Sequence, residues 1–168
     1  MREKFIKILI KLYKRHCPYV WGGQGQNANK LTENDIKAME TSEKNANRVI
    51  QFIKMLVAYK LMTKLTKIFD CSGLVCYALY KCGKENKDFD IRADDLWQKY
   101  KWCKEVTPGN LIHRSGHIAV YIGYNHLIEA KGRDYGVVIS PYDPNEWDAG
   151  SVDPFAALQI KNVTEIIL

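Results

Sequence analysis

The sequence predicts one α+β domain, with helices in its first part and an antiparallel sheet in its second. Before Pro108, apolar residues recur every three or four positions, which is the helical period. After Pro108 they alternate with a period of two and are separated by tight-turn residues, as antiparallel strands require. The 168 residues carry no internal repeat or linker, so we expect a single domain over residues 1–168.

An amphipathic helix is expected at the start of the chain. Apolar residues follow the helical spacing from Phe5 to Leu12, while Lys7 and Lys11 interrupt the run. Because of these charges, and because no small-residue cleavage site follows, the stretch does not fit a secretory signal peptide. No segment reaches the ~20 apolar residues that span a bilayer, so we expect no stable membrane insertion.

Residues 31–67 predict two more helices. Thr32 and Asp35 have the outline of an N-cap followed by an acidic first turn. An apolar stripe then runs from Val49 through Leu56, and we place the break between the two helices near residues 42–47.

The stretch I-F-D-C-S-G-L-V-C-Y-A-L-Y-K-C-G, residues 68–83, predicts a helix with a cysteine at its first position. Asp70 can act as the N-cap, and Gly83 can end the helix. Cys71 would then lie beside unpaired N–H groups at the positive end of the helix dipole, where an anion is favoured. We therefore expect Cys71 to form a reactive thiolate that is alkylated before the other four cysteines.

A short helix is expected around residues 94–100, and strands follow it. The strands are expected over residues 110–114, 117–123, 126–132, 136–142 and, in the tail, 155–163.

His117 and Glu129 lie on two consecutive strands of this set. Ile118 and Val120 face the core, so the His117 side chain leaves on the opposite face of its strand. Glu129 can accept a hydrogen bond from the imidazole and orient it as a base for the Cys71 thiol. A two-residue turn would place the two side chains on opposite faces, whereas a bulge or a three-residue loop keeps them on one face.

Charge and cysteine content narrow the other possibilities. Lys and Arg number 25 against 19 Asp and Glu, and the net charge of +6 is compatible with nucleic acid, an anionic wall polymer or a solvated surface. Five cysteines and four histidines occur at spacings that match no zinc pattern, so we expect reduced thiols, no metal and no cofactor.

Four short motifs resemble the NlpC-type cysteine peptidases, which hydrolyse peptidoglycan peptides. The match runs in order over about residues 5–142, and its motifs are P-Y-V-W-G-G, F-D-C-S-G-L-V, P-G-N-L-I, and G-H-I-A-V-Y-I-G followed by I-E-A. The resemblance implies a papain-like fold in which Cys71 is the nucleophile and His117 the general base. The third catalytic position falls on Glu129, where the family more often has His, Asn or Gln; a carboxylate accepts from the imidazole at least as well.

The resemblance also implies a set of substrate-binding residues. Tyr19 would lie at the site, near the oxyanion. Asp70 and Ser72 would line the pocket for the free amine of the stem peptide.

In two places the chain departs from the family pattern. Residues 24–68 intervene between W-G-G and F-D-C-S-G, where the family has few residues, and we expect them to form a helical insertion. It can pack passively on the core, or it can wall the cleft and offer Lys60, Lys64 and Lys67 to an anionic wall polymer. Asn110 replaces the usual Asp of P-G-D-L, which we expect to bear on stability. The inserted form looks most like enzymes of phages or mobile elements.

Three functions remain open at this point. The first is an endopeptidase that cleaves the γ-D-glutamyl to diamino-acid bond of peptidoglycan stem peptides through a Cys-His-Glu triad and a thioester. The second is another amidase or acyltransferase of the same fold, such as a secreted toxin, and the third is a non-catalytic module that binds cell wall or nucleic acid. The complete set of Cys71, His117 and Glu129 favours an enzyme.

The preferred interpretation also sets expectations about partners and location. We expect a monomer whose partners are stem peptides and that binds no nucleic acid. Without a signal peptide, the protein would be made in the cytoplasm and reach the wall after lysis, in a phage particle or by dedicated secretion.

Overall fold

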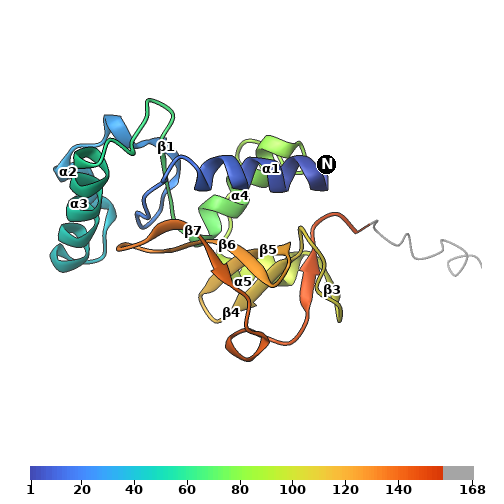
Figure 1. Ribbon diagram of the computed structural model, residues 1–168. Helices are drawn as coiled ribbons and strands as arrows, with labels where there is room; N and C mark the ends of the chain where they lie inside the picture. Colours follow the sequence, from blue (N-terminus) through green and yellow to red (C-terminus); the bar gives the residue numbers. More distant parts are fainter. Residues whose placement is uncertain (157–168) are drawn as a thin grey trace, which may run out of the picture.

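The computed structural model describes residues 1–156, and it confirms the predicted α+β class: helices pack on a six-stranded antiparallel sheet (Figure 1). The helices are α1 (Arg2–Tyr13), α2 (Glu33–Met39), α3 (Glu43–Ala58), α4 (Cys71–Cys82) and α5 (Ala93–Lys99), with 3₁₀ turns η1 (Ala28–Lys30) and η2 (Pro144–Glu146). In spatial order, the sheet contains β3 (Lys101–Cys103), β8 (Ser151–Asp153), β4 (Leu111–Arg114), β5 (His117–Gly123), β6 (His126–Gly132) and β7 (Gly136–Pro141). A separate small sheet pairs β1 (Gln24–Asn27) with β2 (Lys67–Phe69).

The main core lies between the sheet and two helices, α1 and α4, on one of its faces (Figure 1). Phe5 and Leu9 of α1 are fully buried, as the helical spacing predicts. They belong to the same buried cluster as Leu74 of α4, Ile118 of β5 and Ile128 of β6. The two central strands and α4 are therefore fixed against each other by apolar packing.

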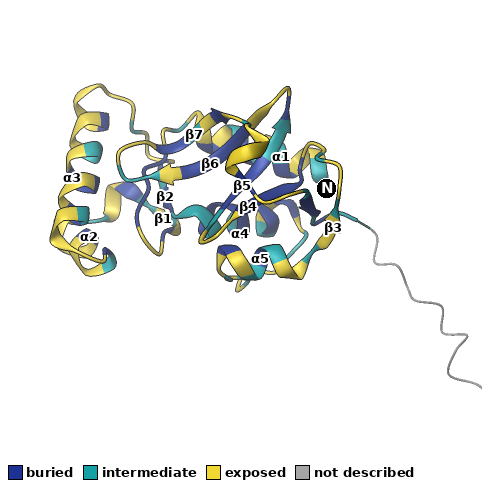
Figure 2. Ribbon diagram, turned by 90° about the horizontal axis from the view of Figure 1, so that it is seen from below, coloured by how far each residue is buried: buried dark blue, intermediate teal, exposed yellow. Residues whose placement is uncertain are grey.

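A second, smaller cluster covers the other face of the sheet. It consists of Ile112, Ala119, Leu127 and Trp147. Figure 2 shows β5 and β6 as largely buried, whereas α2 and α3 are mostly exposed. Side chains on both faces of β5 and β6 are thus held in place, including those of the second face, where His117 emerges.

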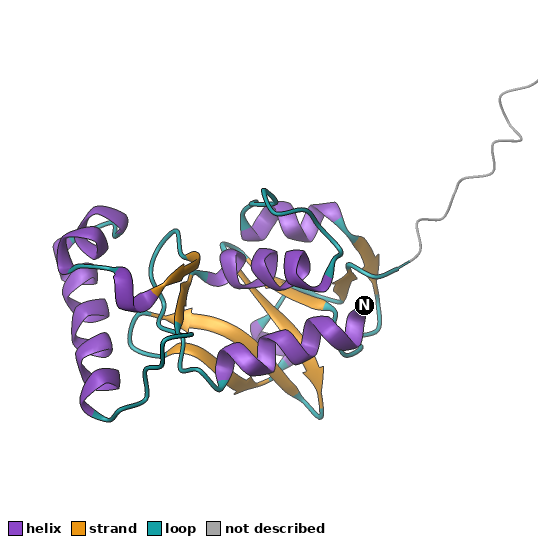
Figure 3. Cartoon of the chain, turned by 90° about the horizontal axis from the view of Figure 1, so that it is seen from above, coloured by secondary structure: helices purple, strands orange, loops and turns teal. Residues whose placement is uncertain are grey.

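Helices α2 and α3 form a hairpin at one end of the molecule, away from α5 (Figure 3). Thr32 and Asp35 make a reciprocal capping box at the start of α2, as the sequence predicts. The break between the helices is Glu40–Ser42, earlier than the expected residues 42–47, because Ser42 caps α3 by accepting from the Asn45 N–H. Helix α3 ends at Ala58 and a loop leads to β2, so the helix does not extend to residue 67.

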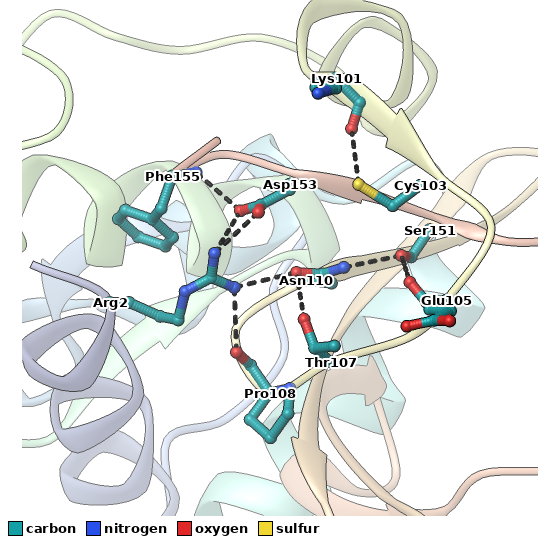
Figure 4. Close-up of polar contacts among 10 residues, drawn as sticks. All are labelled: Arg2, Lys101, Cys103, Glu105, Thr107, Pro108, Asn110, Ser151, Asp153 and Phe155. Carbon is teal, nitrogen blue, oxygen red and sulfur yellow. Dashed lines mark hydrogen bonds and ion pairs between the residues drawn. The ribbon is translucent and has the colours of Figure 1, made fainter. Parts of the chain in front are cut away.

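Asn110 belongs to a buried polar cluster that connects the first helix to the sheet (Figure 4). Its Oδ1 accepts from Arg2 Nη1 at 3.0 Å, and its Nδ2 donates to Ser151 Oγ at 2.8 Å. Arg2 also pairs with Asp153 at 2.7 Å. The position predicted to bear on stability therefore joins α1, the turn before β4, and β8.

Four short strands were not predicted, namely β1, β2, β3 and β8, because three or four residues give too little alternation to recognise. Of the strand expected over residues 155–163, positions 157–163 lie outside the described residues. None of the described helices is long and apolar enough to cross a membrane.

Candidate active site

Cys71 is the first residue of α4, as predicted, and Asp70 is the N-cap. Asp70 Oδ1 accepts from the Gly73 N–H at 2.7 Å and from Ser72 Oγ at 3.3 Å. Asp70 Oδ2 accepts from the Gly22 N–H at 2.9 Å. The same carboxylate that caps the nucleophile's helix therefore also holds the W-G-G turn against it.

The backbone of this turn approaches α4 so closely that only glycine fits. A Cβ at Gly73 would lie 2.0 Å from the carbonyl oxygen of Gly23. That oxygen accepts from the Asp70 N–H at 2.9 Å. The glycine of F-D-C-S-G is therefore required for the W-G-G turn to pack beside Cys71.

His117 and Glu129 lie on one face of the sheet and are hydrogen-bonded, with His117 Nε2 2.7 Å from Glu129 Oε2. The sequence did not decide whether the β5–β6 hairpin contains a bulge, and the structure contains one. Val120 pairs with Ile128, but Gly123 pairs with His126, so the register shifts by one residue. A two-residue turn at Tyr124 and Asn125, both at positive φ, closes the hairpin.

Glu129 is suited to orient the imidazole. Its side chain is only 3% exposed and that of His117 is 15% exposed. Burial raises the pKa of Glu129, but hydrogen bonds from His117 and Ser140 outweigh burial and hold this pKa below its ordinary value. An ionised carboxylate only accepts hydrogen bonds, so Nε2 of His117 is the donor to Glu129, and Nδ1 is the ring nitrogen that this hydrogen bond does not use.

The sulfur of Cys71 lies next to the backbone on both sides of His117. Its Sγ donates to the Gly116 carbonyl at 3.8 Å, and the Ile118 N–H donates to the sulfur. The start of α4 and the start of β5 thus meet, which brings the predicted nucleophile and base together.

The environment of Cys71 in the free protein does not favour the expected thiolate. Burial raises the pKa of Cys71 to about 11, and the Asp70 carboxylate raises it further. These two effects exceed the opposing effect of the N–H groups of Ser72 and Ile118. At neutral pH the thiol of the free protein is therefore protonated, and a base must remove its proton when it attacks.

A cleft of about 360 Å³ opens above Cys71. Four segments line it: the turn from Tyr19 to Gln24, the start of α4 from Asp70 to Ser72, residues 90–94, which lead into α5, and Gly116 of the β4–β5 turn. All three predicted substrate-binding residues therefore lie in the wall of one cleft. Asp90 and Asp94 add carboxylates that the sequence reading did not identify as part of the site.

Tyr19 is mostly buried, with 7% of its surface exposed. Burial raises its pKa, and the neighbouring Cys71 and Asp70 raise it further, so its phenol remains a neutral hydrogen-bond donor at neutral pH. Such a donor beside the nucleophile can stabilise a developing oxyanion.

Sequence reasoning missed a second histidine near the site. His113 Nε2 lies 2.8 Å from Asp94 Oδ1, and His113 Nδ1 lies 2.5 Å from Asp148 Oδ2. Asp94 Oδ1 also accepts from the Gly116 N–H at 3.0 Å. His113 is two residues after the buried Leu111, so both side chains lie on the same face of β4, and a buried histidine needs polar partners. Nothing in the sequence identifies Asp94 and Asp148 as those partners.

Within residues 1–156, no group of three or more His, Cys, Asp or Glu side chains could hold a metal ion.

Comparisons with known proteins identify the family and the fold of this chain. The model of the NlpC/P60 family matches residues 56–153, so it begins after the W-G-G turn and includes Cys71, His117 and Glu129. A comparison with curated protein sequences gave no match.

Solved structures with the same fold cover nearly the whole chain. The P60 domain of an antigen from Mycobacterium avium subspecies paratuberculosis has a TM-score of 0.59 and 18% identity over 93% of this chain and 96% of its own. The peptidoglycan hydrolase RipB from Mycobacterium tuberculosis has the same TM-score and identity over 93% of this chain and 67% of its own.

A third similar structure differs in activity. RipD from Mycobacterium tuberculosis, described as a non-catalytic NlpC/P60 domain protein adapted to peptidoglycan binding, has a TM-score of 0.56 and 18% identity over 90% of this chain and 95% of its own. The fold therefore occurs in both a hydrolase and a binding protein, so it does not by itself decide activity. With a family match over more than half of its length and the same fold, this chain belongs to the NlpC/P60 family.

Proposed function

We propose that the protein is a cysteine endopeptidase that hydrolyses peptidoglycan stem peptides at the γ-D-glutamyl to diamino-acid bond. One observation carries the proposal. The Cys71 sulfur is hydrogen-bonded to the Gly116 carbonyl and the Ile118 N–H, the backbone groups before and after His117, and His117 is hydrogen-bonded to the buried Glu129. A module that only binds peptidoglycan has no use for this set of groups.

The reaction follows from the protonation states. The Cys71 sulfur attacks the peptide carbonyl carbon while Nδ1 of His117 takes the thiol proton, because the thiol is protonated beforehand. Glu129 stabilises the imidazolium that forms. The C–N bond then breaks, the leaving amine takes the proton from Nδ1, and a thioester remains on Cys71.

Hydrolysis of the thioester returns the enzyme to its starting state. Nδ1 of His117 accepts a proton from water, the resulting hydroxide attacks the thioester carbonyl, and the C–S bond breaks as the proton passes to sulfur. The Tyr19 phenol and the Cys71 N–H, which is at the helix N-terminus, are placed to stabilise the oxyanion in both steps.

The acidic walls of the cleft favour a substrate with a free amine. Asp70, Asp90 and Asp94 line the cleft, and Arg92 is the one basic residue among its described lining residues. A stem peptide whose L-alanine amine is free carries a positive charge that these carboxylates attract. The same peptide attached to its sugar lacks that charge.

The test is incubation of purified protein with two defined stem peptides, one with a free amine and one acylated at that amine, followed by mass spectrometry of the products. We expect L-alanyl-γ-D-glutamate from the free peptide, and slower cleavage of the acylated one. Binding to intact sacculi without any product would instead support the binding-module interpretation. Cleavage of a different amide would support another amidase of the same fold.

A further inference from the structure

A carboxylate of the α2–α3 hairpin bonds directly to the wall of the cleft. Glu40 follows α2, and its side chain is fully buried. Its Oε1 accepts from the Trp21 N–H at 2.9 Å. Its Oε2 accepts from Nε of Arg133 at 2.7 Å and forms an ion pair with Nη2 of Arg133 at 2.7 Å. Both oxygens are therefore used, one by the cleft wall and one by the turn between β6 and β7.

Arg133 also reaches the candidate oxyanion donor. Its guanidinium carbon lies 5.4 Å from the ring centroid of Tyr19, which is within the range of a cation–π contact. Only 16% of the Arg133 side chain is exposed. Glu40 therefore fixes a guanidinium that covers one face of the Tyr19 ring.

The wall from Tyr19 to Gly22 is held by two carboxylates from two different parts of the chain. The Trp21 N–H donates to Glu40 and the next N–H, of Gly22, donates to Asp70. Asp70 belongs to the helix of the nucleophile, whereas Glu40 belongs to the α2–α3 hairpin. Because two consecutive backbone N–H groups are each bonded to a different carboxylate, this short segment has little freedom to move.

We propose that Glu40 is a positioning residue for the active site, acting through Arg133 and the Trp21 amide to hold Tyr19 and its wall beside Cys71. The α2–α3 hairpin then helps to build the cleft and is more than an appendage. As a role in cleavage, this inference rests on the proposed function. As a role in the geometry around Cys71, it can be measured without any substrate.

The chain provides a matched control for simple anchoring. Arg48 of α3 pairs with Asp134 of the same β6–β7 turn, and Arg48 Nε lies 3.1 Å from Asp134 Oδ1. These side chains are 43% and 47% exposed, and within the described residues neither lines the cleft at Cys71. The Arg48 pair therefore joins the same two segments as the Glu40 pair, but without contact to the cleft wall.

The experiment compares Glu40→Ala, Glu40→Gln and Arg48→Gln by kcat and KM on a stem peptide, by the rate of Cys71 alkylation, and by thermal midpoint. Glu40→Ala should lower kcat/KM by roughly 10-fold to 10²-fold, since displacing a reacting group by about 1 Å costs that order. Glu40→Gln should be intermediate, because its amide oxygen still accepts from the Trp21 N–H. Arg48→Gln should stay within about twofold of the wild type, because an exposed ion pair contributes little.

Alkylation of Cys71 by iodoacetamide separates this inference from the proposed function. With Glu40→Ala the loosened wall should expose the sulfur and speed labelling by about threefold or more, whether or not the protein cleaves any peptide. If Glu40→Ala and Arg48→Gln lower the thermal midpoint alike, and neither alters Cys71 labelling or kcat/KM, Glu40 is an anchor only and the inference is overturned. If no variant cleaves the peptide but labelling still responds to Glu40 alone, the proposed function fails and the positioning role stands.

Discussion

The two histidines at the ends of the β4–β5 turn, four residues apart, are bonded in opposite ways. His117 uses Nε2 for a single carboxylate, Glu129, and within the described residues Nδ1 has no hydrogen-bond partner. His113 has both ring nitrogens bonded to carboxylates, Asp94 and Asp148. The difference shows what a catalytic base requires: one nitrogen oriented by a partner and one left free for the reaction.

His113 is built for support. Its ring stacks on Trp97 with the centroids 5.2 Å apart, and its side chain is only 8% exposed. The imidazole thus connects Asp94 of α5 to Asp148, which lies after η2. Asp94 in turn holds the Gly116 amide, and the Gly116 carbonyl accepts from Cys71. His113 therefore supports the turn that precedes His117, the proposed base.

Replacing each histidine should give the largest contrast. His117→Ala should reduce kcat on a stem peptide by at least about 10⁴-fold, as loss of a triad base does, with little change in folding. His113→Phe keeps a ring to stack on Trp97, so we expect kcat to fall by less than about 10-fold. Steady-state kinetics of both variants provide the measurement, and comparable losses would mean that the two roles are not distinct.

The pH dependence of Cys71 should be nearly as large. Because the pKa of the thiol is about 11, the thiolate fraction grows about tenfold per pH unit and by about 10³-fold between pH 7 and pH 10. Iodoacetamide labelling of Cys71, quantified by peptide mass spectrometry in the absence of substrate, should rise accordingly. A plateau below pH 8 would show instead that His117 and Cys71 form an ion pair in the free enzyme.

Glu129 should have an intermediate effect, since it orients His117 without touching the substrate. Glu129→Ala should cost on the order of 10²-fold in kcat/KM, whereas Glu129→Gln keeps an acceptor and should retain partial activity. The kinetics of the two variants, compared at equal folded fraction, measure the value of the charge. If Glu129→Ala cleaves as fast as the wild type, another group orients His117.

His113→Phe should cause the smallest change in kcat but a clear loss of stability. His113→Phe removes two hydrogen bonds to charged groups and should lower the free energy of unfolding by about 1–3 kcal/mol. Urea denaturation measures this loss, and Asp148→Asn, which keeps a neutral acceptor, should lose less. An unchanged unfolding midpoint for His113→Phe would remove the support role assigned to this residue.

Much of the site follows from local pattern. Asp70 directly before Cys71 predicts a capped helix start, and the cap is present. Strand alternation predicts the face of His117. Whether Glu129 shares that face depends on one extra residue, a bulge, in the β5–β6 hairpin. The alternation of apolar and polar residues does not reveal this bulge, because chains with and without it can show the same pattern.

The remaining parts depend on contacts between distant segments. Glu40 and Arg133 are 93 positions apart, and no periodicity relates a residue after α2 to the β6–β7 turn. Nor does the sequence show that Lys67 donates to the Gly25 carbonyl at 2.8 Å, or that Lys60 and Lys64 lie outside the lining of the cleft at Cys71; their attraction to a wall polymer stays a prediction. The raised pKa of Cys71 could not be predicted for the same reason: the helix N-terminus is visible in the sequence, but the burial that outweighs it is not.

The most direct test of the catalytic assignment uses a stem peptide in which the scissile amide is replaced by a chloromethyl ketone. The protein is incubated with this reagent, and the labelled residue is mapped by mass spectrometry. We predict labelling that saturates with reagent concentration, occurs at Cys71 among the five cysteines, and is much slower in His117→Ala than in His113→Phe. Labelling of Cys103 in preference to Cys71, or a rate that never saturates, would contradict the assignment of this cleft as a peptidase active site.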